Sequence, residues 1–429
     1  MKAVILAAGK GTRLNPITSL RPKPMIPIGG KPLLEHTILN LRDIGVQEFL
    51  IIVGYKEEVI KNYFGNGLSN FNVKIEYATQ LEHLGTSHAV GFAKDFVGDD
   101  DFFLMYGDLL TDPQVFKEVL ELYKKSRCEG LISLFKVNNP QEYGIISLNK
   151  EAFVERITEK PSVDLDLGNL ANAGIFIFNP LIFKAIELTE LSMRNEYEFT
   201  DSMQILIDQL KGKIKGYVIK NLFWSDIGLP WHLLEANEFI LKGIKSSLEG
   251  KLEDNVIVSG NVFIGKNSLV KSGSYIQGPC YIGEKCLIGP NAYIRPYTYI
   301  GNDCHIGMSE VKNSLIFSNT SIPHFNYIGD SIICENVNLG AGTKISNLRF
   351  DNKSISMIIK EKSINSGRRK LGAIIGPNSQ TGINSSIMCG KKIGRDSIIG
   401  AHTLVNEDIP SNTLYYQSEN GIIKKSRKT

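Results

Sequence analysis

The sequence predicts an α/β domain, built on a Rossmann-like, mixed but mainly parallel sheet, followed by a parallel β-helix. Short apolar runs alternate with helix-like patterns as far as about residue 245. From Val258 to Ile306, an aliphatic residue then recurs every six positions without a miss. These two periods predict domains over 1–245 and 253–415, with a basic C-terminal tail over 416–429.

The segment 1–245 alternates between two kinds of pattern. Short apolar runs predict strands at Ala3–Leu6, Phe49–Val53, Val73–Ala78, Phe102–Tyr106, Leu131–Val137 and Ile175–Phe178. Helical patterns cover Pro32–Ile44, Thr86–Asp95, Pro113–Lys125 and Pro230–Lys242. Such alternation is typical of α/β domains with a mainly parallel sheet.

The six-residue repeat predicts a solenoid with three short strands per coil. Neither an α-helix nor an ordinary hairpin sustains such a repeat. Glycine directly follows the aliphatic residue at positions 265, 283, 289, 301 and 307. The phase slips after Gly307 and again before Ile333, and a polar insertion over 348–371 interrupts the repeat before it returns at Ile375. A solenoid describes a shape and not a chemistry, so a purely structural role for this half stays open.

Composition excludes several classes of partner. The 48 basic and 45 acidic residues leave a formal charge of only +3, so we expect no nucleic-acid partner. The apolar run after Met1–Lys2 is too short for a secretory signal, and we expect no membrane partner. Six cysteines without CxxC spacing favour reduced thiols and a cytoplasmic location. Cys280, Cys286, Cys304 and Cys334 lie at multiples of six residues, which favours small packing residues over a metal column.

The glycine-rich bend after the first strand has the chemistry of a triphosphate cradle. The segment Gly9-Lys10-Gly11-Thr12-Arg13 can turn tightly and point bare N–H groups at an anion, and Arg13 and Lys23 add positive charge. The GxxxxGK[ST] and GxGxxG patterns are both absent. A glycine bend alone is weak evidence, because many strand–helix turns carry one without a ligand.

The longer pattern LAAGKGTRL–PKPMIPIGGKPLLEH resembles the signature of sugar-1-phosphate nucleotidylyltransferases. The resemblance implies that Arg13 and Lys23 are catalytic. It implies nucleotide contacts from Leu6, Ala8, Gly9, Gly11 and Thr12, with UTP or dTTP as the nucleotide.

Asp108 and Asp226 are the candidate metal ligands. Nucleotidyl transfer needs a divalent metal on the α-phosphate but no general base, because the attacking phosphate oxygen is already anionic. Mg²⁺ takes one or two protein carboxylates, and each aspartate follows an apolar run. Either residue alone could instead be a helix cap or a turn residue. The resemblance places metal ligands at both positions and implies Mg²⁺, or Mn²⁺ or Co²⁺ in its place.

Further matches are carried by the resemblance. The segment from Gln80 to Thr86 resembles the one in which a glutamine reads a pyrimidine edge while Gly85 and Thr86 approach the base. The sugar-phosphate elements of the family are matched by Gly144, Glu159, Lys160 and Asn172, with Lys160 on the phosphate. Without the family, Glu159-Lys160 is an ordinary surface ion pair and Asn172 a strand-edge residue.

The segments from Ile322 to Asp330 and from Asn336 to Thr343 resemble the acetyltransferase domain of bacterial bifunctional enzymes that make UDP-N-acetylglucosamine. The repeat likewise resembles hexapeptide-repeat acyltransferases, which implies a left-handed β-helix and a homotrimer. N-acetylation needs a base for the amine proton and an N–H donor for the thioester oxyanion. His324 is the candidate base, and the Ala341 N–H is the candidate oxyanion donor.

The same resemblance assigns the acceptor site. Asn347 would orient the histidine, while Arg295, Lys312, Tyr327, Asn338 and Lys353 would hold the sugar phosphate. Taken alone, a histidine in a coil corner is more often structural, as we expect of His305 and His402.

The sequence departs from the bacterial pattern in two places. Asn15–Thr18 and Arg21–Pro24 look more like glucose-1-phosphate thymidylyltransferases. Leu348-Arg349-Phe350 replaces a tyrosine and a glycine, and the insertion resembles that of archaeal-type bifunctional enzymes, which are often broad in base and sugar.

We therefore expect a bifunctional enzyme with small-molecule substrates. Acetyl-CoA would acetylate glucosamine-1-phosphate or its galacto epimer, and the product or glucose-1-phosphate would receive UMP or dTMP. One alternative is a monofunctional mannose-1-phosphate guanylyltransferase, against which the Gln80 segment and the His324 motif argue. Another is a non-catalytic pyrophosphorylase-like scaffold, which should have lost Lys23, Asp108 or Asp226.

Overall fold

The computed structural model describes residues 1–137, 139–159, 168–419 and 421–427, and divides the chain into two compact units. The first unit contains Met1–Lys10, Pro22–Met25 and Leu33–Asp226. The second contains Ile227–Thr429 together with two N-terminal segments, Gly11–Arg21 and Ile26–Pro32. Over the described ranges, no helix combines the length and the apolar character that crossing a bilayer requires.

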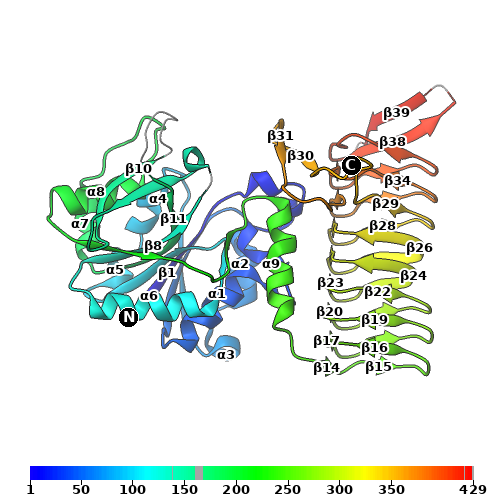
Figure 1. The fold of residues 1–429 in the computed structure, drawn as a ribbon, viewed down its shortest axis with the longest axis horizontal. Coiled ribbons are helices and arrows are strands. Elements are labelled where there is room, and N and C mark those ends of the chain that lie inside the picture. The colour runs from blue at the N-terminus through cyan, green and yellow to red at the C-terminus, as the bar shows by residue number, and fades with distance from the viewer. Residues whose placement is uncertain (138, 160–167, 420, 428–429) are drawn as a thin grey trace. The chain divides into compact units, whose positions relative to one another are not determined.

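A nine-stranded mixed sheet forms the centre of the first unit (Figure 1). The parallel part contains β6 (Phe102–Tyr106), β1 (Lys2–Ala7), β4 (Glu48–Val53) and β5 (Lys74–Thr79), in that order. On the other side of β6 lie β11 (Leu170–Phe178), β9 (Gly144–Leu148) and β10 (Val154–Glu159), which pair antiparallel, and β8 (Gly130–Lys136) joins β11 to β12 (Ile214–Val218). A separate ribbon pairs β7 (Leu109–Thr111) with β13 (Trp224–Asp226). The predicted α/β class with a mixed sheet is confirmed.

Helices flank the strands of this unit, and those that the sequence pattern predicted are present with two adjustments. The helices at predicted positions are α1 (Leu33–Asp43), α4 (Thr86–Gly91), α5 (Lys94–Val97) and α6 (Pro113–Lys125). The helices α2 (Glu57–Phe64), α3 (Leu68–Phe71), α7 (Leu181–Glu187) and α8 (Phe199–Asp208) were not predicted. The 3₁₀ turns η3 (Lys23–Met25) and η4 (Pro140–Glu142) also lie in this unit, whereas η1 (Thr12–Leu14) and η2 (Ile17–Ser19) belong to the second. Pro32 lies in β3 (Lys31–Pro32), paired with β2 (Pro27–Ile28), so α1 begins just after the predicted start. The predicted helix Thr86–Asp95 is divided after Gly91, because glycine is a poor helix former.

The second unit contains a β-helix whose coils stack through parallel strands (Figure 1). One ladder is β14 (Ser247–Leu248), β17 (Val262–Ile264), β20 (Cys280–Ile282), β23 (Thr298–Ile300), β25 (Leu315–Ile316), β27 (Ile332–Ile333), β32 (Ile374–Ile375) and β35 (Lys392–Ile393). The second is β15 (Lys251–Leu252), β18 (Leu269–Val270), β21 (Leu287–Ile288), β24 (His305–Lys312), β26 (Ser321–Gly329), β28 (Asn338–Leu339), β33 (Gln380–Thr381), β36 (Ile398–Ile399) and β38 (Thr413–Ser418). The third is β16 (Ile257–Ser259), β19 (Tyr275–Gln277), β22 (Tyr293–Ile294), the second halves of β24 and β26, β29 (Lys344–Ile345), β34 (Ser386–Ile387) and β37 (Leu404–Val405).

Strand register explains the phase slips of the repeat. Successive partners along the second ladder are Leu287, His305, Ser321, Asn338 and Gln380. The steps to Ser321 and to Asn338 are shorter than the full coil between Leu287 and His305, so each of them moves the repeat out of phase. The step from Asn338 to Gln380 exceeds a full coil by the length of the segment 348–371. The insertion therefore leaves the coil as a side loop, which carries the hairpin β30 (Ser356–Ile359) and β31 (Lys362–Asn365).

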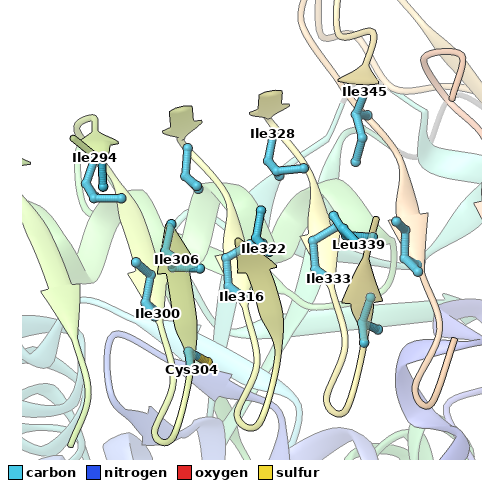
Figure 2. Packing of buried hydrophobic residues seen from close by; sticks show 14 of the residues in the cluster. Ile294, Ile300, Cys304, Ile306, Ile316, Ile322, Ile328, Ile333, Leu339 and Ile345 are labelled. Carbon is cyan, nitrogen blue, oxygen red and sulfur yellow. The ribbon is translucent and has the colours of Figure 1, made fainter. Parts of the chain in front are cut away.

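Aliphatic side chains from successive strands fill the interior of the β-helix (Figure 2). Ile294, Ile300, Ile306 and their equivalents in later coils are fully buried, and burial of each contributes about 1.5–3 kcal/mol. Cys280, Cys286 and Cys304 are part of the same core. The thiol of Cys280 donates to backbone carbonyls of Gln277 and Arg295, 3.0 Å away in each case.

The C-terminal residues predicted as a basic tail contain regular structure. β38 and β39 (Gly421–Ser426) form an antiparallel hairpin, and Tyr415 in β38 is fully buried in the solenoid core. Lys424 lies opposite Tyr415 in this hairpin, and its ammonium group lies 3.1 Å from a carboxylate oxygen of Glu407. Strand pairing therefore orders a segment that charge alone predicted to be a solvated tail.

The two N-terminal segments of the second unit lie against α9 (Pro230–Lys242) and the β-helix. The Gly29 N–H donates to Asn237 Oδ1 at 3.2 Å, and Asn237 Nδ2 donates to the Tyr297 carbonyl at 2.9 Å. Asn237 is fully buried, so this side chain joins the segment around Gly29 to the coil that contains Tyr297.

Candidate functional sites

The glycine-rich bend follows the carboxyl end of β1, in the middle of the parallel part of the sheet. Ala8 O accepts a hydrogen bond from Tyr55 N at 3.1 Å, and Leu6 O accepts one from Gly107 N at 2.8 Å. A β-carbon on Gly54 would lie 2.9 Å from Ala8 O, whereas one on Gly9 would meet no atom within 4 Å. The backbone at Gly9 is therefore open to a ligand at the sheet edge where α/β folds bind ligands.

The remaining signature residues of the bend fall in the second unit. Gly11 has a left-handed conformation (φ 61°), and its carbonyl accepts from Thr18 Oγ1 at 3.1 Å. Thr12 and Arg13 follow in η1, and both are exposed.

Lys23 and Asp108 form an ion pair in the first unit. Lys23 lies in η3, and Asp108 lies shortly after the end of β6. The Lys23 side chain is 13% exposed and that of Asp108 is 32% exposed, so one side of the carboxylate faces solvent.

The β7–β13 ribbon places Asp226 on the strand that pairs with the residues following Asp108. Asp226 pairs with Leu109, the residue that follows Asp108 in the chain. Among the residues that the structure describes, no cluster holds three or more histidine, cysteine or acidic side chains, so the donor set here is two carboxylates. This set fits Mg²⁺, which uses one or two protein carboxylates and completes its octahedron with phosphate and water oxygens.

The segment from Gln80 to Thr86 begins α4 beside the end of β5. Gln80 is buried, and its Nε2 lies 3.2 Å from both the Gly85 carbonyl and His88 Nδ1. Gly85 has φ +110°, and a β-carbon there would collide with the backbone of Tyr197. Thr86 Oγ1 accepts from Phe199 N at 3.1 Å, so its hydroxyl is engaged at the start of α8. His88 was not among the predicted residues, because its contact with Gln80 depends on the turn into α4.

The predicted sugar-binding residues lie on β9, β10 and β11. Gly144 pairs with Glu159, and a β-carbon on Gly144 would lie 2.8 Å from Glu159 Oε2. Asn172 Oδ1 accepts from Gly174 N at 2.8 Å. Arg194 Nη2 lies 3.7 Å from Glu159 Oε1 and was not predicted. Lys160 lies outside the described residues.

Tyr106 is a further residue that the sequence did not indicate. It ends β6, just before Asp108, and a β-carbon on Gly174 would lie 2.5 Å from its ring. Burial, and then the charges of Glu159 and Asp108, raise the pKa of its phenol, so the hydroxyl stays protonated. Tyr106 therefore links the predicted sugar-binding residues to the predicted metal ligand.

In the β-helix, His324 lies where β26 passes between two faces of the coil. It is exposed and pairs with Met308, at a shift in the register of β24 and β26. Its carbonyl accepts from Gly342 N at 2.8 Å. The pKa of His305 on the preceding coil is lowered, first by burial and then by the nearby His324 and Lys271. The structure thus places His305 close to His324, although the sequence indicated no functional role for it.

The turn 340–342 presents the Ala341 amide beside this histidine. Gly340 N donates to the Thr381 carbonyl at 3.0 Å, and Gly342 N to His324. Ala341 O accepts from Asn384 N at 2.7 Å, whereas the Ala341 N–H donates to no residue of the described chain. This geometry fits an N–H available to an oxyanion.

Asp330 holds together several of the residues predicted to bind the acetyl acceptor. It is 2% exposed and accepts from Lys312 at 3.2 Å, Asn347 at 2.6 Å and Asn313 at 2.8 Å. Asn347 Nδ2 also lies 3.2 Å from the Tyr327 hydroxyl. The amide of Asn347 is thus directed at Asp330 and Tyr327, and its predicted role in orienting His324 stays a prediction.

A cleft of about 900 Å³ opens next to this network. Tyr327 and Asn347 line it together with Lys344, Arg349 and Phe350. Burial raises the pKa of Tyr327, so its hydroxyl is a proton donor at neutral pH.

The other predicted acceptor residues lie around the same strands. Arg295 donates to Glu310 at 2.8 Å, on the strand that pairs with β26. Asn338 is exposed on β28, between Ser321 and Gln380. Lys353 is exposed in the insertion, and its N–H lies 3.2 Å from Asp351 Oδ1.

Comparison with known proteins gives matches to both halves. The family described as nucleotidyl transferase matches residues 2–243, more than half of the chain, and the one described as GMPPB C-terminal domain matches residues 276–409. "Bifunctional protein GlmU" of Methanococcus maripaludis strain S2 is 45% identical over 428 residues, covering 100% of both chains. "Bifunctional sugar-1-phosphate nucleotidylyltransferase/acetyltransferase" of Sulfurisphaera tokodaii is 41% identical over 412 residues, which cover 95% of this chain and 98% of its own.

Among solved structures, UDP-glucose pyrophosphorylase complexed with UDP-glucose aligns with a TM-score of 0.51 and 27% identity. The alignment covers 56% of this chain and 98% of that protein.

Proposed function

Because the chain belongs to the nucleotidyl transferase family, we propose that its N-terminal half, which includes the signature loop Gly11–Arg21, transfers UMP or dTMP to a sugar-1-phosphate. The enzyme is a sugar-1-phosphate nucleotidyltransferase that also carries an acetyltransferase activity. The acetyltransferase belongs to the β-helix, within 253–415. The observation that supports the nucleotidyl assignment is the Lys23–Asp108 ion pair after β6, with Asp226 paired to Leu109, the residue that follows Asp108.

Nucleotidyl transfer at this edge depends on charge and position. The open backbone at Gly9, with Gly11 and Arg13, would hold the β- and γ-phosphates. Asp108 and Asp226 would hold Mg²⁺, which neutralises charge on the α-phosphate. Lys23 would move from Asp108 to the phosphates, and Gly144, Glu159, Lys160 and Asn172 would position the sugar phosphate in line for attack.

Acetyl transfer would use the corner of β26. His324 would take the proton of the attacking amine, and the Ala341 N–H would stabilise the thioester oxyanion. Lys312, Arg295 and Tyr327 would bind the phosphate of glucosamine-1-phosphate, because two cations and a protonated phenol face this side of the coil. Asn338 and Lys353 would complete the site, and acetyl-CoA would be the donor.

A mannose-1-phosphate guanylyltransferase is the second candidate, favoured by the match of the β-helix to the GMPPB C-terminal domain. That match covers the solenoid, whereas the bifunctional relatives match the whole chain. A non-catalytic scaffold is disfavoured because both candidate metal-binding aspartates and the lysine are in place.

A substrate matrix tests the assignment. UTP, dTTP, CTP and GTP would be combined with N-acetylglucosamine-1-phosphate, glucose-1-phosphate and mannose-1-phosphate, and released pyrophosphate would be measured. We expect turnover with UTP or dTTP and the first two sugars. Turnover confined to GTP and mannose-1-phosphate would overturn the proposal in favour of the second candidate.

We further propose a cytoplasmic homotrimer assembled through the β-helix. Family resemblance supports it, together with the need for a groove between neighbouring coils to bind an extended CoA. Light scattering should report three chains, and a stable, active monomer would refute the trimer.

A further inference from the structure

The side-chain amide of Gln80 is held by two acceptors, one on Gly85 just before α4 and one on His88 within α4. The Nε2 atom lies 3.2 Å from the Gly85 carbonyl and 3.2 Å from His88 Nδ1. A carbonyl oxygen can only accept, so the atom that faces Gly85 is the amide nitrogen and not the oxygen. His88 Nδ1 must then be an acceptor as well, which places the imidazole proton on Nε2.

The oxygen of the same amide is left for a ligand. No described residue donates a hydrogen bond to Gln80 Oε1. This atom is also not one of the fully buried polar atoms without a partner in the described ranges, so it keeps some exposure. Since Gln80 as a whole is only 6% exposed, the amide plane is fixed while Oε1 remains accessible.

We propose that His88 is a positioning residue that makes this site select uracil or thymine over cytosine, an inference that rests on the proposed pyrimidine nucleotidyl transfer. With Nε2 held by Gly85 and His88, Gln80 presents only an acceptor to the base. The proposed arrangement places Gln80 Oε1 opposite N3 of the base, where uracil and thymine carry a donor and cytosine carries an acceptor. A free glutamine could rotate its amide to suit either base, but a glutamine held on two acceptors cannot do so without losing both hydrogen bonds.

His88 itself is held by its surroundings. It is half-buried in α4, and its ring lies edge-on to Phe92 with centroids 5.0 Å apart. A phenylalanine at position 88 would keep this aromatic contact and remove only the acceptor. His83, which is exposed in the same loop, provides a matched control.

The test compares kcat/KM for UTP and CTP in His88→Phe, His83→Phe, Gln80→Ala and the double variant His88→Phe/Gln80→Ala. We expect the UTP-to-CTP ratio to fall about tenfold in His88→Phe, mainly through KM, and to stay unchanged in His83→Phe. In the Gln80→Ala background, His88→Phe should change the ratio no further, because His88 acts through Gln80.

An unchanged ratio in His88→Phe, with UTP still preferred, would overturn the inference and leave the proposed function intact. The inference would also be overturned if His88→Phe lowered the UTP-to-CTP ratio equally in the wild-type and Gln80→Ala backgrounds. A merely structural role for His88 predicts that its effect and that of Gln80→Ala add in this way. Wild-type enzyme without turnover of any pyrimidine nucleotide would instead refute the proposed function itself.

Discussion

Arg21 and Glu335 form a partly buried ion pair between the signature loop and the solenoid, with Arg21 Nη2 2.6 Å from Glu335 Oε1. The guanidinium also lies over the ring of Phe317, 5.2 Å from its centroid. The Arg21 side chain is 21% exposed and that of Glu335 only 10%. The segment that carries Gly11, Thr12 and Arg13 is therefore anchored on the β-helix.

Glu335→Gln should raise the KM for UTP several-fold and lower the melting temperature. Breaking a buried pair leaves an uncompensated charge, at a cost of about 3–5 kcal/mol, reduced here because Arg21 is partly exposed. The control is Glu407→Gln, which removes an exposed pair with Lys424 and should change neither quantity. A lower melting temperature with an unchanged KM would show that the anchor does not order the nucleotide loop.

Asp108→Asn and Asp226→Asn should each abolish Mg²⁺-dependent pyrophosphate release and leave acetyl transfer unchanged. Either change removes one of the two negative charges that would hold the metal. Pyrophosphate release and CoA release would be measured on the same preparations. Near-normal nucleotidyl transfer in either variant would contradict the metal assignment.

His324→Ala should lower the rate of acetyl transfer to glucosamine-1-phosphate by about 10²–10⁴ and spare nucleotidyl transfer. The loss reflects the absence of a proton acceptor for the amine. A free-thiol assay of CoA release would measure it, and His402→Ala provides a control histidine elsewhere on the solenoid. Full acetyl transfer by a folded His324→Ala protein would show that His324 has only a structural role.

Asp330→Asn should raise the KM for glucosamine-1-phosphate at least tenfold. The buried carboxylate accepts from Lys312, Asn313 and Asn347, and an amide cannot satisfy three donors in the same way. Glu249→Gln, which removes an exposed pair with Lys266 far along the solenoid from this network, is the matched control. If the KM were unchanged while stability fell, the network would support only the fold.

Native alkylation near pH 8 should spare Cys280 and Cys334, whereas all six cysteines should react in denaturant. Burial raises the pKa of the Cys280 thiol to about 12, and it raises that of Cys334 well above its ordinary value. Both therefore remain thiols at pH 8, and only the thiolate reacts. Mass spectrometry would identify the modified residues, and rapid native labelling of Cys280 would contradict its burial.

Sequence periodicity predicted those elements whose side chains follow a regular pattern. The strand Phe102–Tyr106 and the helices Pro113–Lys125 and Pro230–Lys242 match their predicted bounds, and the aliphatic repeat corresponds to the interior of the coils. Each of these elements buries one face or one stripe of side chains. The spacing of apolar residues that reveals it therefore lies within the element itself.

The missed features depend on contacts between segments that are distant in the sequence. The anchoring of Gly11–Arg21 rests on Glu335, which lies in the other half of the chain. The position of His88 depends on a turn at Gly85 that is crowded by Tyr197. The contacts of the Asn347 amide with Asp330 and Tyr327 likewise depend on the stacking of coils, which spacing along the chain does not determine.

The long step from Asn338 to Gln380 makes the solenoid tolerant of changes in length at one place. Ile332 pairs with Ile374 and Lys344 with Ser386 across the same step, so all three faces resume in register after the side loop. Residues 348–371 can therefore be lengthened, shortened or replaced without shifting a later coil, whereas one residue added within a strand would displace the following side chains of that strand to the opposite face. Because Leu348, Arg349 and Phe350 of this segment line the cleft of about 900 Å³, a change of the loop alters the wall of the cleft while the solenoid core stays as it is.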